Sequence, residues 1–358
     1  MVEQQRKVRV ALLFGGRSGE HSISAATAAG VMKAIDRDKY DVVPVGITRE
    51  GQWVLAGGDA SAFELTAGKL PEVTAESGRS VVGLSEIGEV DVVFPLLHGP
   101  FGEDGTIQGL LEMADVRYVG CGVLASAVGM DKQYMKLVFA GHGLPVGPYV
   151  VIQPRDWEQR QPETIKRVSD ELAFPVFVKP ARAGSSLGVT RVDDISGLVD
   201  AIETARFHDP KVLVEQGIEG REIECAVLGG RGGAAPRASV PGEIVVDHDA
   251  ADFYDFEAKY LSASQARTDA PADLPDEVAQ KVRDLAVRAF EAIGGEGISR
   301  VDVFVTPDGE AVINEINTMP GFTPISMYPK MWEATGLSYP DLIDELIQLA
   351  LERPLGLR

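Results

Sequence analysis

Short apolar runs alternate with small or polar segments through the first third of the chain. Residues 8–14 predict a strand with a continuous apolar run, which leads into a glycine-rich loop and an alanine-rich segment ending near residue 35. Two further apolar runs, 40–47 and 90–97, have the length and continuity of buried strands. Strands that alternate with helices form parallel sheets with helices on both faces, so residues 1–129 are predicted to be a Rossmann-like, doubly wound domain.

Beyond this region the pattern changes to amphipathic helices mixed with short strands. Residues 131–141 and 194–207 have helical periodicity, and two apolar strands carry charged residues, Lys179 and Glu215, near their ends. This mixture predicts a compact α+β domain over residues 130–224.

The C-terminal region, 225–358, predicts a second α+β domain. It contains a long polar stretch, about 247–271, which precedes an amphipathic helix that starts near Pro275 and stops at Gly294-Gly295. A polar segment of this length is usually a functional lid or a disordered loop. Its aromatic residues favour the lid: Phe253, Tyr254, Phe256 and Tyr260.

The stretch from Arg300 to Asn317 predicts a β-hairpin. Asp308-Gly309 is a favoured two-residue turn. Counting outward from that turn places Asp302 opposite Glu315 and Arg300 opposite Asn317. Strand residues two apart share a face, so these four side chains are expected to point the same way.

A divalent cation would stabilise the two acidic side chains of this hairpin. Two carboxylates about 5 Å apart repel by about 3 kcal/mol at an effective dielectric constant of about 20. Carboxylate and amide oxygens suit Mg²⁺ better than zinc. The alternative is a solvated polar face, which is the more common fate of such residues. The neighbouring Arg300 and an apolar opposite face favour the metal site, the apolar residues being Val301, Val303, Val305 and Ile313.

Composition and charge narrow the class of protein. A chain of 358 residues is long enough for two or three domains. A formal net charge of −20 argues against a general nucleic-acid or anionic-membrane surface, so a phosphate site must be locally basic. Cys121 and Cys225 lack metal-ligand spacing and predict a reducing, cytoplasmic compartment. The first apolar run predicts a strand rather than a signal peptide, and no apolar stretch is long enough to cross a bilayer.

Candidate phosphate-binding residues lie in the middle region. The chain has neither a P-loop nor the protein-kinase motifs. Lys179 at a strand end, followed by small residues through Gly188, could cradle an anion, although a plain hairpin loop is the commoner explanation. Lys132 could bind phosphate or be an ordinary surface charge. The backbone of Glu215 could contact an adenine, and Glu222 could bind a ribose. For both glutamates the alternative is a solvated side chain.

Two histidines and one glutamate belong to the first region. Ligands gather at the carboxyl ends of parallel strands, and both Glu20 and His98 follow such ends. For His21 and His98, a structural and a functional role are equally compatible with the sequence.

Seven motifs in order resemble those of the ATP-grasp superfamily and, within it, of the D-alanine:D-alanine ligases. The resemblance spans nearly the whole chain and implies an ATP-grasp architecture. The motifs are Phe14-Gly-Gly-x-Ser-Gly-Glu-His-Ser22, Leu97-His-Gly99, Met130-Asp-Lys132, Val178-Lys-Pro180 with Gly184-Ser-Ser186, Phe256-Glu-Ala-Lys-Tyr260, Arg300-Val-Asp302 and Asn314-Glu-Ile-Asn-Thr-Met-Pro-Gly321.

The resemblance implies four sets of functional residues. The ATP-binding set is Lys132, Lys179, Ser185, Ser186, Glu215, Glu222 and Lys259. The metal set for two Mg²⁺ ions, which Mn²⁺ could replace, is Asp302, Glu315 and Asn317. The substrate-binding set is Glu20, His98, Arg300, Gly321, Ser326 and Met327. The catalytic set is Glu20, Ser185, Tyr260 and Arg300.

The activity implied is ATP-dependent ligation of two D-alanine molecules through an acyl phosphate, for peptidoglycan precursors. D-alanine and ATP are the expected partners, a homodimer is the expected assembly, and activation by K⁺ is compatible with the family. The alternative is another ATP-grasp carboxylate-amine ligase, such as one making D-alanyl-D-lactate, or a non-catalytic nucleotide-binding protein. The lid Glu257-Ala-Lys-Tyr260 favours an amine as the second nucleophile, and Arg300 favours catalysis.

Overall fold

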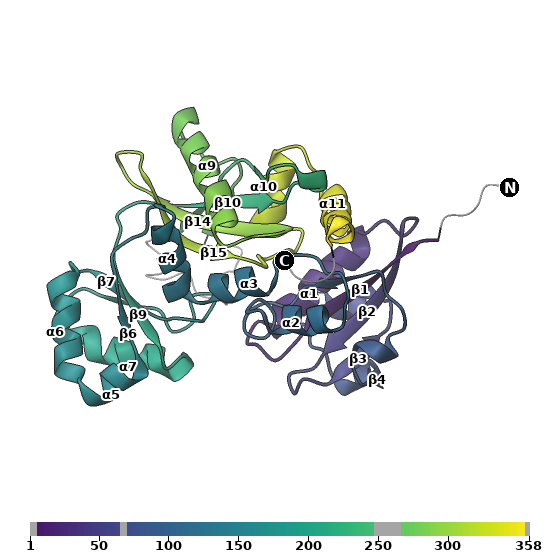
Figure 1. Ribbon diagram of the computed structural model, residues 1–358, viewed down its shortest axis with the longest axis horizontal. Helices are drawn as coiled ribbons and strands as arrows, with labels where there is room; N and C mark the ends of the chain where they lie inside the picture. The colour runs from purple at the N-terminus through teal and green to yellow at the C-terminus, as the bar shows by residue number, and fades with distance from the viewer. Residues whose placement is uncertain (1–5, 65–69, 247–265, 355–358) are drawn as a thin grey trace.

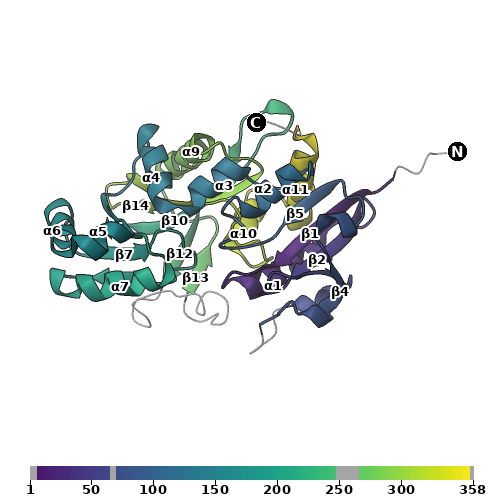
Figure 2. The same ribbon diagram turned by 60° about the horizontal axis from the view of Figure 1, so that its bottom comes forward.

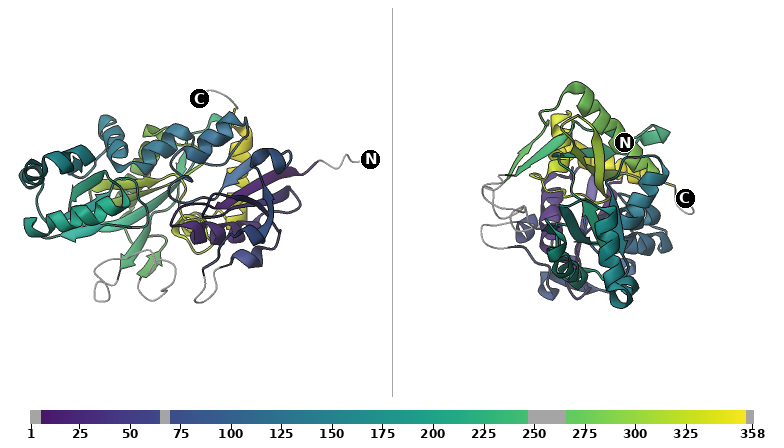
Figure 3. Two further views of the ribbon diagram at one scale, coloured as in Figure 1. Left: turned by 90° about the horizontal axis from the view of Figure 1, so that it is seen from below. Right: turned by 90° about the vertical axis from the view of Figure 1, so that its left-hand side faces the viewer.

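The computed structural model describes residues 6–64, 70–246 and 266–354, which form three β-sheets with their covering helices (Figure 1). The N-terminal sheet lies at one end of the long axis and the middle sheet at the other, with the C-terminal sheet between them (Figure 3). No helix among these residues is both long and apolar enough to span a membrane.

The N-terminal sheet has the order β4-β3-β2-β1-β5. Strands β2, β1 and β5 are parallel, as predicted, whereas β3 and β4 add an antiparallel edge. The strands are β1 (Val8–Gly15), β2 (Tyr40–Ile47), β3 (Trp53–Ala56), β4 (Gly78–Val81) and β5 (Val92–Pro95).

Helices cover both faces of this sheet, as expected for a doubly wound domain. Alternate residues of β1 belong to two different apolar cores, with Leu12 in one and Leu13 in the other. The first core includes α1 (His21–Ala34) and the C-terminal helix α11 (Tyr339–Glu352), whereas the second includes α2 (Thr106–Met113). The C-terminal helix thus completes the first unit, and Figure 2 shows α11 beside β5.

The middle sheet is antiparallel, with the order β6-β9-β7-β8. Its helices pack on one face only, around a core that includes Trp157, Val178 and Val214. These helices therefore do not cover the opposite face, which carries Lys179 and Glu215. The elements are β6 (Tyr149–Ile152), α5 (Pro154–Gln159), α6 (Gln161–Glu171), β7 (Val176–Pro180), β8 (Thr190–Val192), α7 (Leu198–His208) and β9 (Val212–Gln216).

The C-terminal sheet has the order β13-β12-β10-β14-β15, with β11 paired to β10. Its strands are β10 (Arg221–Leu228), β11 (Arg237–Ala238), β12 (Gly242–Val246), β13 (Ala266–Asp269), β14 (Ile298–Val305) and β15 (Ala311–Asn317). The predicted domain boundary between residues 224 and 225 falls inside β10.

Three helices surround the C-terminal sheet, and one short helix connects it to the first unit. α4 (Lys132–Gly141) and α9 (Asp276–Ala292) pack on its apolar face, while α10 (Met327–Ala334) packs against β10 on the other. α3 (Val123–Met130) leads from the first unit to α4. The apolar face carries the predicted hairpin residues Val301, Val303, Val305 and Ile313, all buried.

The β14–β15 hairpin has the predicted pairing. Arg300 lies opposite Asn317, and Asp302 lies opposite Glu315. The polar face of the hairpin is therefore assembled as expected from the sequence.

The turn that joins the two strands differs from the prediction. The backbone N–H of Thr306 donates to the carbonyl of Glu310 (2.9 Å), so the loop has three residues, and the predicted two-residue turn is wrong. Gly309 has a φ of +79°, which is the left-handed residue typical of three-residue hairpin loops. The longer loop shifts the register by one, and a β-bulge at Asn314 shifts it back.

Candidate active site

Residues from all three units converge at the carboxyl end of β1. The hydroxyl of Ser185, in the loop after β7, donates to the Glu20 carboxylate at 2.6 Å. Lys132 at the start of α4 contacts Glu315 of β15 at 3.2 Å. These contacts bring together residues that the sequence separates by 165 and 183 positions (185 − 20 and 315 − 132).

The loop after β7 approaches Glu20 closely through small residues. Ser185 and Ser186 have φ values of 51° and 58°, in the left-handed region that non-glycine residues seldom adopt. A Cβ atom added at Gly184 would lie 3.3 Å from a Glu20 oxygen. Such local backbone strain is typical of functional loops.

Both histidines are buried and hydrogen-bonded. His21 contacts the carbonyl of Gly16 through Nδ1 (2.7 Å) and accepts the N–H of Val73 at Nε2 (2.9 Å), so it has a structural role as a neutral ring. Burial lowers the pKa of His21 and of His98.

Both ring nitrogens of His98 contact polar groups of the protein. Its Nδ1 contacts the carbonyl of Met319 (3.1 Å), and its Nε2 contacts the Thr27 hydroxyl (3.2 Å). The ring therefore ties β5 to the C-terminal segment, and its predicted contact with a substrate remains a prediction.

Lys132 is held at the junction of the three units. Its ammonium donates to the carbonyl of Ala183 at 2.9 Å, in addition to its contact with Glu315. Asp131 caps the helix by accepting the N–H groups of Gln133 and Tyr134. Burial would lower the pKa of Lys132, but the Glu315 carboxylate reverses this and raises it.

Glu215 binds two lysines on the face of the middle sheet that lacks helices. One carboxylate oxygen lies 3.0 Å from Lys136 of α4, and the other lies 2.5 Å from Lys179 of β7. Burial would raise the pKa of Glu215, but the two ammonium groups lower it to about 2. The carboxylate therefore stabilises the two charged lysines. The backbone of Glu215 is paired with the neighbouring strands on both sides, opposite Tyr149 in β6 and Phe177 in β7.

We expect the stability of the protein to depend on this carboxylate in acid. The folded pKa of Glu215, about 2, lies below its ordinary value of 4.5, so the unfolded chain takes up the proton first as the pH falls. The contribution is full above pH 4.5 and is lost toward pH 2. Urea midpoints measured across this range should fall less steeply for Glu215→Gln than for the native chain. The exposed Glu89→Gln serves as a control, and a Glu215→Gln slope equal to the native one would contradict the pairing.

Three carboxylates form a row across neighbouring strands of the C-terminal sheet. Glu224 of β10 lies opposite Asp302 of β14, which lies opposite Glu315 of β15. Arg300 donates to both oxygens of Asp302 (2.6 Å each) and lies 3.3 Å from Glu224. Burial would lower the pKa of Arg300, but Asp302 and Glu224 raise it well above its ordinary value. The Asn317 amide donates to Asp302 at 3.2 Å.

The oxygen donors of this row are compatible with a hard cation. Asp302 and Glu315 face each other and are balanced by Arg300 and Lys132, so the protein already supplies positive charge where a metal would lie. Within residues 6–64, 70–246 and 266–354, no group of three or more His, Cys, Asp and Glu side chains is preassembled as a metal cluster. The donor chemistry still fits Mg²⁺, which binds proteins through one or two carboxylates.

A further carboxyl group, from Glu103, was missed by sequence reasoning. It accepts the backbone N–H of Gly99 at 2.7 Å. Burial, together with the negative charges of Glu20 and Glu315, raises its pKa to about 8. Its place in the loop after His98 was the signal that could have identified it. Lys136 and Glu224 were missed as well.

Three of the predicted substrate-binding residues lie at or before the N-terminus of α10. Ser326 immediately precedes the helix, and its hydroxyl contacts the N–H of Thr323 (3.1 Å). Met327 is the first helical residue, and Gly321 lies in the preceding loop. Free N–H groups in the first turn of a helix favour an anion. Glu222 lies exposed at the start of β10, whereas Lys259 and Tyr260 lie outside the described residues.

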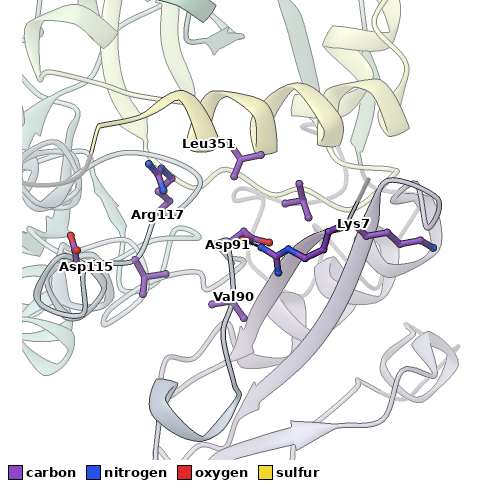
Figure 4. Close-up of a pocket in the computed structure, with 9 residues that line it drawn as sticks. Lys7, Val90, Asp91, Asp115, Arg117 and Leu351 are labelled. Carbon is purple, nitrogen blue, oxygen red and sulfur yellow. Dashed lines mark hydrogen bonds and ion pairs between the residues drawn. The ribbon is translucent and has the colours of Figure 1, made fainter. Parts of the chain in front are cut away.

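Two pockets open at opposite ends of the N-terminal sheet. One of about 320 Å³ lies at the carboxyl ends of β1 and β5, where Gly16, Ser18 and His98 line it. The other, of about 450 Å³, lies at the amino ends beside α11 (Figure 4). Its Asp91 is already bound by Arg6 (2.6 Å) and by the N–H of Arg9 (2.7 Å). Ligands of parallel sheets bind at the carboxyl ends, so only the first pocket adjoins the site.

Comparison with known proteins gives a consistent family. Models of the D-ala D-ala ligase N-terminus and C-terminus match residues 9–121 and 138–348. The D-alanine--D-alanine ligase of Pseudarthrobacter chlorophenolicus is 60% identical over 98% of this chain and 96% of its own length. That of Kineococcus radiotolerans is 57% identical over the full length of both chains.

Two solved structures are also similar to this one. The D-alanine-D-alanine ligase from Coxiella burnetii is 36% identical, with a TM-score of 0.78 over 96% of this chain and 94% of that chain. The VanG D-Ala:D-Ser ligase from Enterococcus faecalis is 36% identical, with a TM-score of 0.81 over 96% of this chain and all of that chain.

Proposed function

The chain belongs to the D-alanine–D-alanine ligase family and has its ATP-grasp fold, and from this premise we propose how its described residues perform the reaction. The chain catalyses the ATP-dependent joining of two D-alanine molecules. Two contacts support the assignment of the site most strongly: Ser185 with Glu20, and Lys132 with Glu315. Together they bring residues of all three units around one space.

The nucleotide would lie between the middle and C-terminal sheets. Lys132 and Lys179 face this space and carry the charge that triphosphate oxygens require. Asp302, Glu315 and Asn317 would hold Mg²⁺, two ions by analogy with the family, with Mn²⁺ as a substitute and K⁺ as a possible activator. When bound, the metal would neutralise charge on the phosphates.

The two D-alanine molecules would lie between Glu20 and α10. The Glu20 carboxylate would bind the ammonium of the first, and the start of α10, with Ser326, would bind the carboxylate of the second. The first carboxylate attacks the γ-phosphorus in line and ADP leaves, which gives an acyl phosphate. The amine of the second molecule then attacks the acyl carbon, and phosphate leaves.

Arg300 is the candidate donor to the oxyanion of the second step. Its Nε and Nη2 atoms are occupied by Asp302, which fixes the guanidinium plane. A guanidinium has five N–H donors, so three remain to stabilise a developing negative charge. The hydrogen bond between Ser185 and Glu20 belongs to the network that would take the proton from the incoming amine, together with Tyr260.

The domain organisation and cellular setting follow from the same premise. We place the boundaries after residue 129 and before β10, so that the whole strand remains in the C-terminal unit. The protein would act in the cytoplasm as a homodimer and supply the dipeptide for peptidoglycan precursors.

A phosphate-release assay with different second substrates tests the function. Phosphate should appear with D-alanine at a rate that matches dipeptide formation, and far more slowly with L-alanine, D-lactate or D-serine. A faster rate with D-lactate would favour the depsipeptide alternative, and a faster rate with D-serine would favour a D-Ala:D-Ser specificity like that of the VanG relative.

Tyr260→Ala is expected to uncouple ATP hydrolysis from ligation. An acyl phosphate must be kept from water, and an aromatic lid residue would exclude it. The ratio of phosphate released to dipeptide formed should rise above one in the variant. A ratio that stays at one would argue against the lid role.

A further inference from the structure

Lys136 is a buried lysine for which the proposed reaction has no role. It lies in α4, one helical turn after Lys132, and its side chain is 2% exposed. Three charged groups and one ring lie around it: Glu215 of β9, Lys179 of β7, Lys132 of its own helix and the ring of Tyr149 in β6 (5.7 Å). Removing a lysine from water is costly, so its retention at this depth requires an explanation.

The two oxygens of Glu215 are divided between two lysines. Oε1 lies 3.0 Å from Lys136, and Oε2 lies 2.5 Å from Lys179. A carboxylate that faced only one ammonium could turn both oxygens toward it. Lys136 therefore fixes the rotation of the carboxylate, and the three groups together carry one net positive charge.

We propose that Lys136 is a positioning residue for the nucleotide, which holds one oxygen of Glu215 so that Lys179 keeps an ammonium free to bind phosphate. This inference rests on the proposed role of Lys179 at the ATP phosphates. Lys136 acts through Glu215 and does not touch the nucleotide, because its side chain has almost no exposed surface. Without it, Glu215 would bind Lys179 with both oxygens and neutralise its charge.

The charges around Lys136 give the proposal a pH signature. Burial, with a further effect from Lys179 and Lys132, lowers the pKa of Lys136 below 10.5, although Glu215 opposes this. As the pH rises, Lys136 loses its proton before an ordinary lysine does. The affinity for ATP in the native protein should therefore weaken on the alkaline side, and this weakening should be absent from a variant with a neutral side chain at position 136.

Lys136→Met tests the proposal, because methionine keeps the length of the side chain and removes its charge. Residues of one ion-pair network couple by between about two- and one-hundredfold. The dissociation constant of a non-hydrolysable ATP analogue with Mg²⁺ should rise about tenfold, and the KM for D-alanine should stay within about twofold. Thermal unfolding shows whether the variant is folded. Lys166→Met, an exposed lysine in the same unit, is the matched control.

A double-mutant cycle separates this inference from the role of Lys179. If Lys136 acts through Lys179, then Lys136→Met combined with Lys179→Met should bind the analogue no more weakly than Lys179→Met alone. Multiplicative losses would overturn the proposal, as would an unchanged analogue affinity in a folded Lys136→Met protein. If Lys179→Met alone leaves the affinity unchanged, the proposed phosphate site itself is wrong.

Discussion

Replacing Glu315 by glutamine should lower kcat about a thousandfold in a protein that remains folded. Glu315 lies opposite Asp302 and is one of only two carboxylates in the proposed metal set. A bound metal contributes several kcal/mol to charge stabilisation in the transition state, and each 1.36 kcal/mol is a tenfold change in rate. Loss of one of two anionic ligands should therefore remove most of the Mg²⁺-dependent rate.

The Mg²⁺ dependence of the remaining activity distinguishes a metal ligand from a structural residue. The Mg²⁺ concentration for half-maximal activity should rise in Glu315→Gln, as seen in a titration at saturating ATP. Glu310→Gln is the matched control, since Glu310 lies at the turn of the same hairpin and pairs with Lys281. If Glu315→Gln retains activity and Mg²⁺ dependence within about fivefold, the hairpin does not bind the metal.

Arg300→Lys is expected to cost between about a hundred- and a thousandfold in kcat. This range is typical for the loss of one oxyanion donor. Lysine keeps the positive charge between Asp302 and Glu224, so the three carboxylates remain balanced. It cannot form the two-pronged contact with Asp302 that fixes the donor plane.

The step that fails in Arg300→Lys is specific. Acyl phosphate formation precedes the tetrahedral intermediate and releases ADP, so ADP should still form in a single turnover while phosphate release and dipeptide formation fall. The KM for ATP should change little, because Arg300 is assigned to the second step. Equal losses of ADP formation and dipeptide formation would remove Arg300 from the oxyanion role and assign it to the metal site.

The β14–β15 hairpin has the predicted residue pairing, although the turn from which that pairing was deduced is wrong. The pairing of Asp302 with Glu315 was predicted from a two-residue turn, and the turn has three residues. The bulge at Asn314 compensates for the extra loop residue. Bulges have no reliable local signature in a single sequence, whereas an alternating apolar face does constrain which side chains point inward.

One of the three lysines at the site, Lys136, was not predicted from the sequence. Lys132 and Lys179 were predicted from motifs, but Lys136 was not, because a lysine in a helix is usually exposed. Its spacing of four residues from Lys132 was a usable signal, since residues four apart share a helix face. The pairing with Glu215 depends on how α4 packs against a sheet that begins later in the chain, and that packing is a tertiary property.

The sequence predicts the fold of each unit, but it does not predict how distant segments pack together. The apolar runs predicted the parallel strands of the first unit, because buried strands are continuous in apolar residues. The docking of α11 against α1 and β5 joins the last helix to the first sheet and has no local signal. The choice between structural and functional histidine at position 21 likewise depended on hydrogen bonds to Gly16 and Val73.

Electron paramagnetic resonance of Mn²⁺ provides the most direct measurement of the central claim, that the β14–β15 hairpin holds the divalent metal that binds the nucleotide. With ATP present, the native protein should bind Mn²⁺ in a protein-coordinated form, and both Asp302→Asn and Glu315→Gln should lose it while Glu310→Gln retains it. Protein-coordinated Mn²⁺ with unchanged affinity in folded Asp302→Asn and Glu315→Gln proteins would contradict the account.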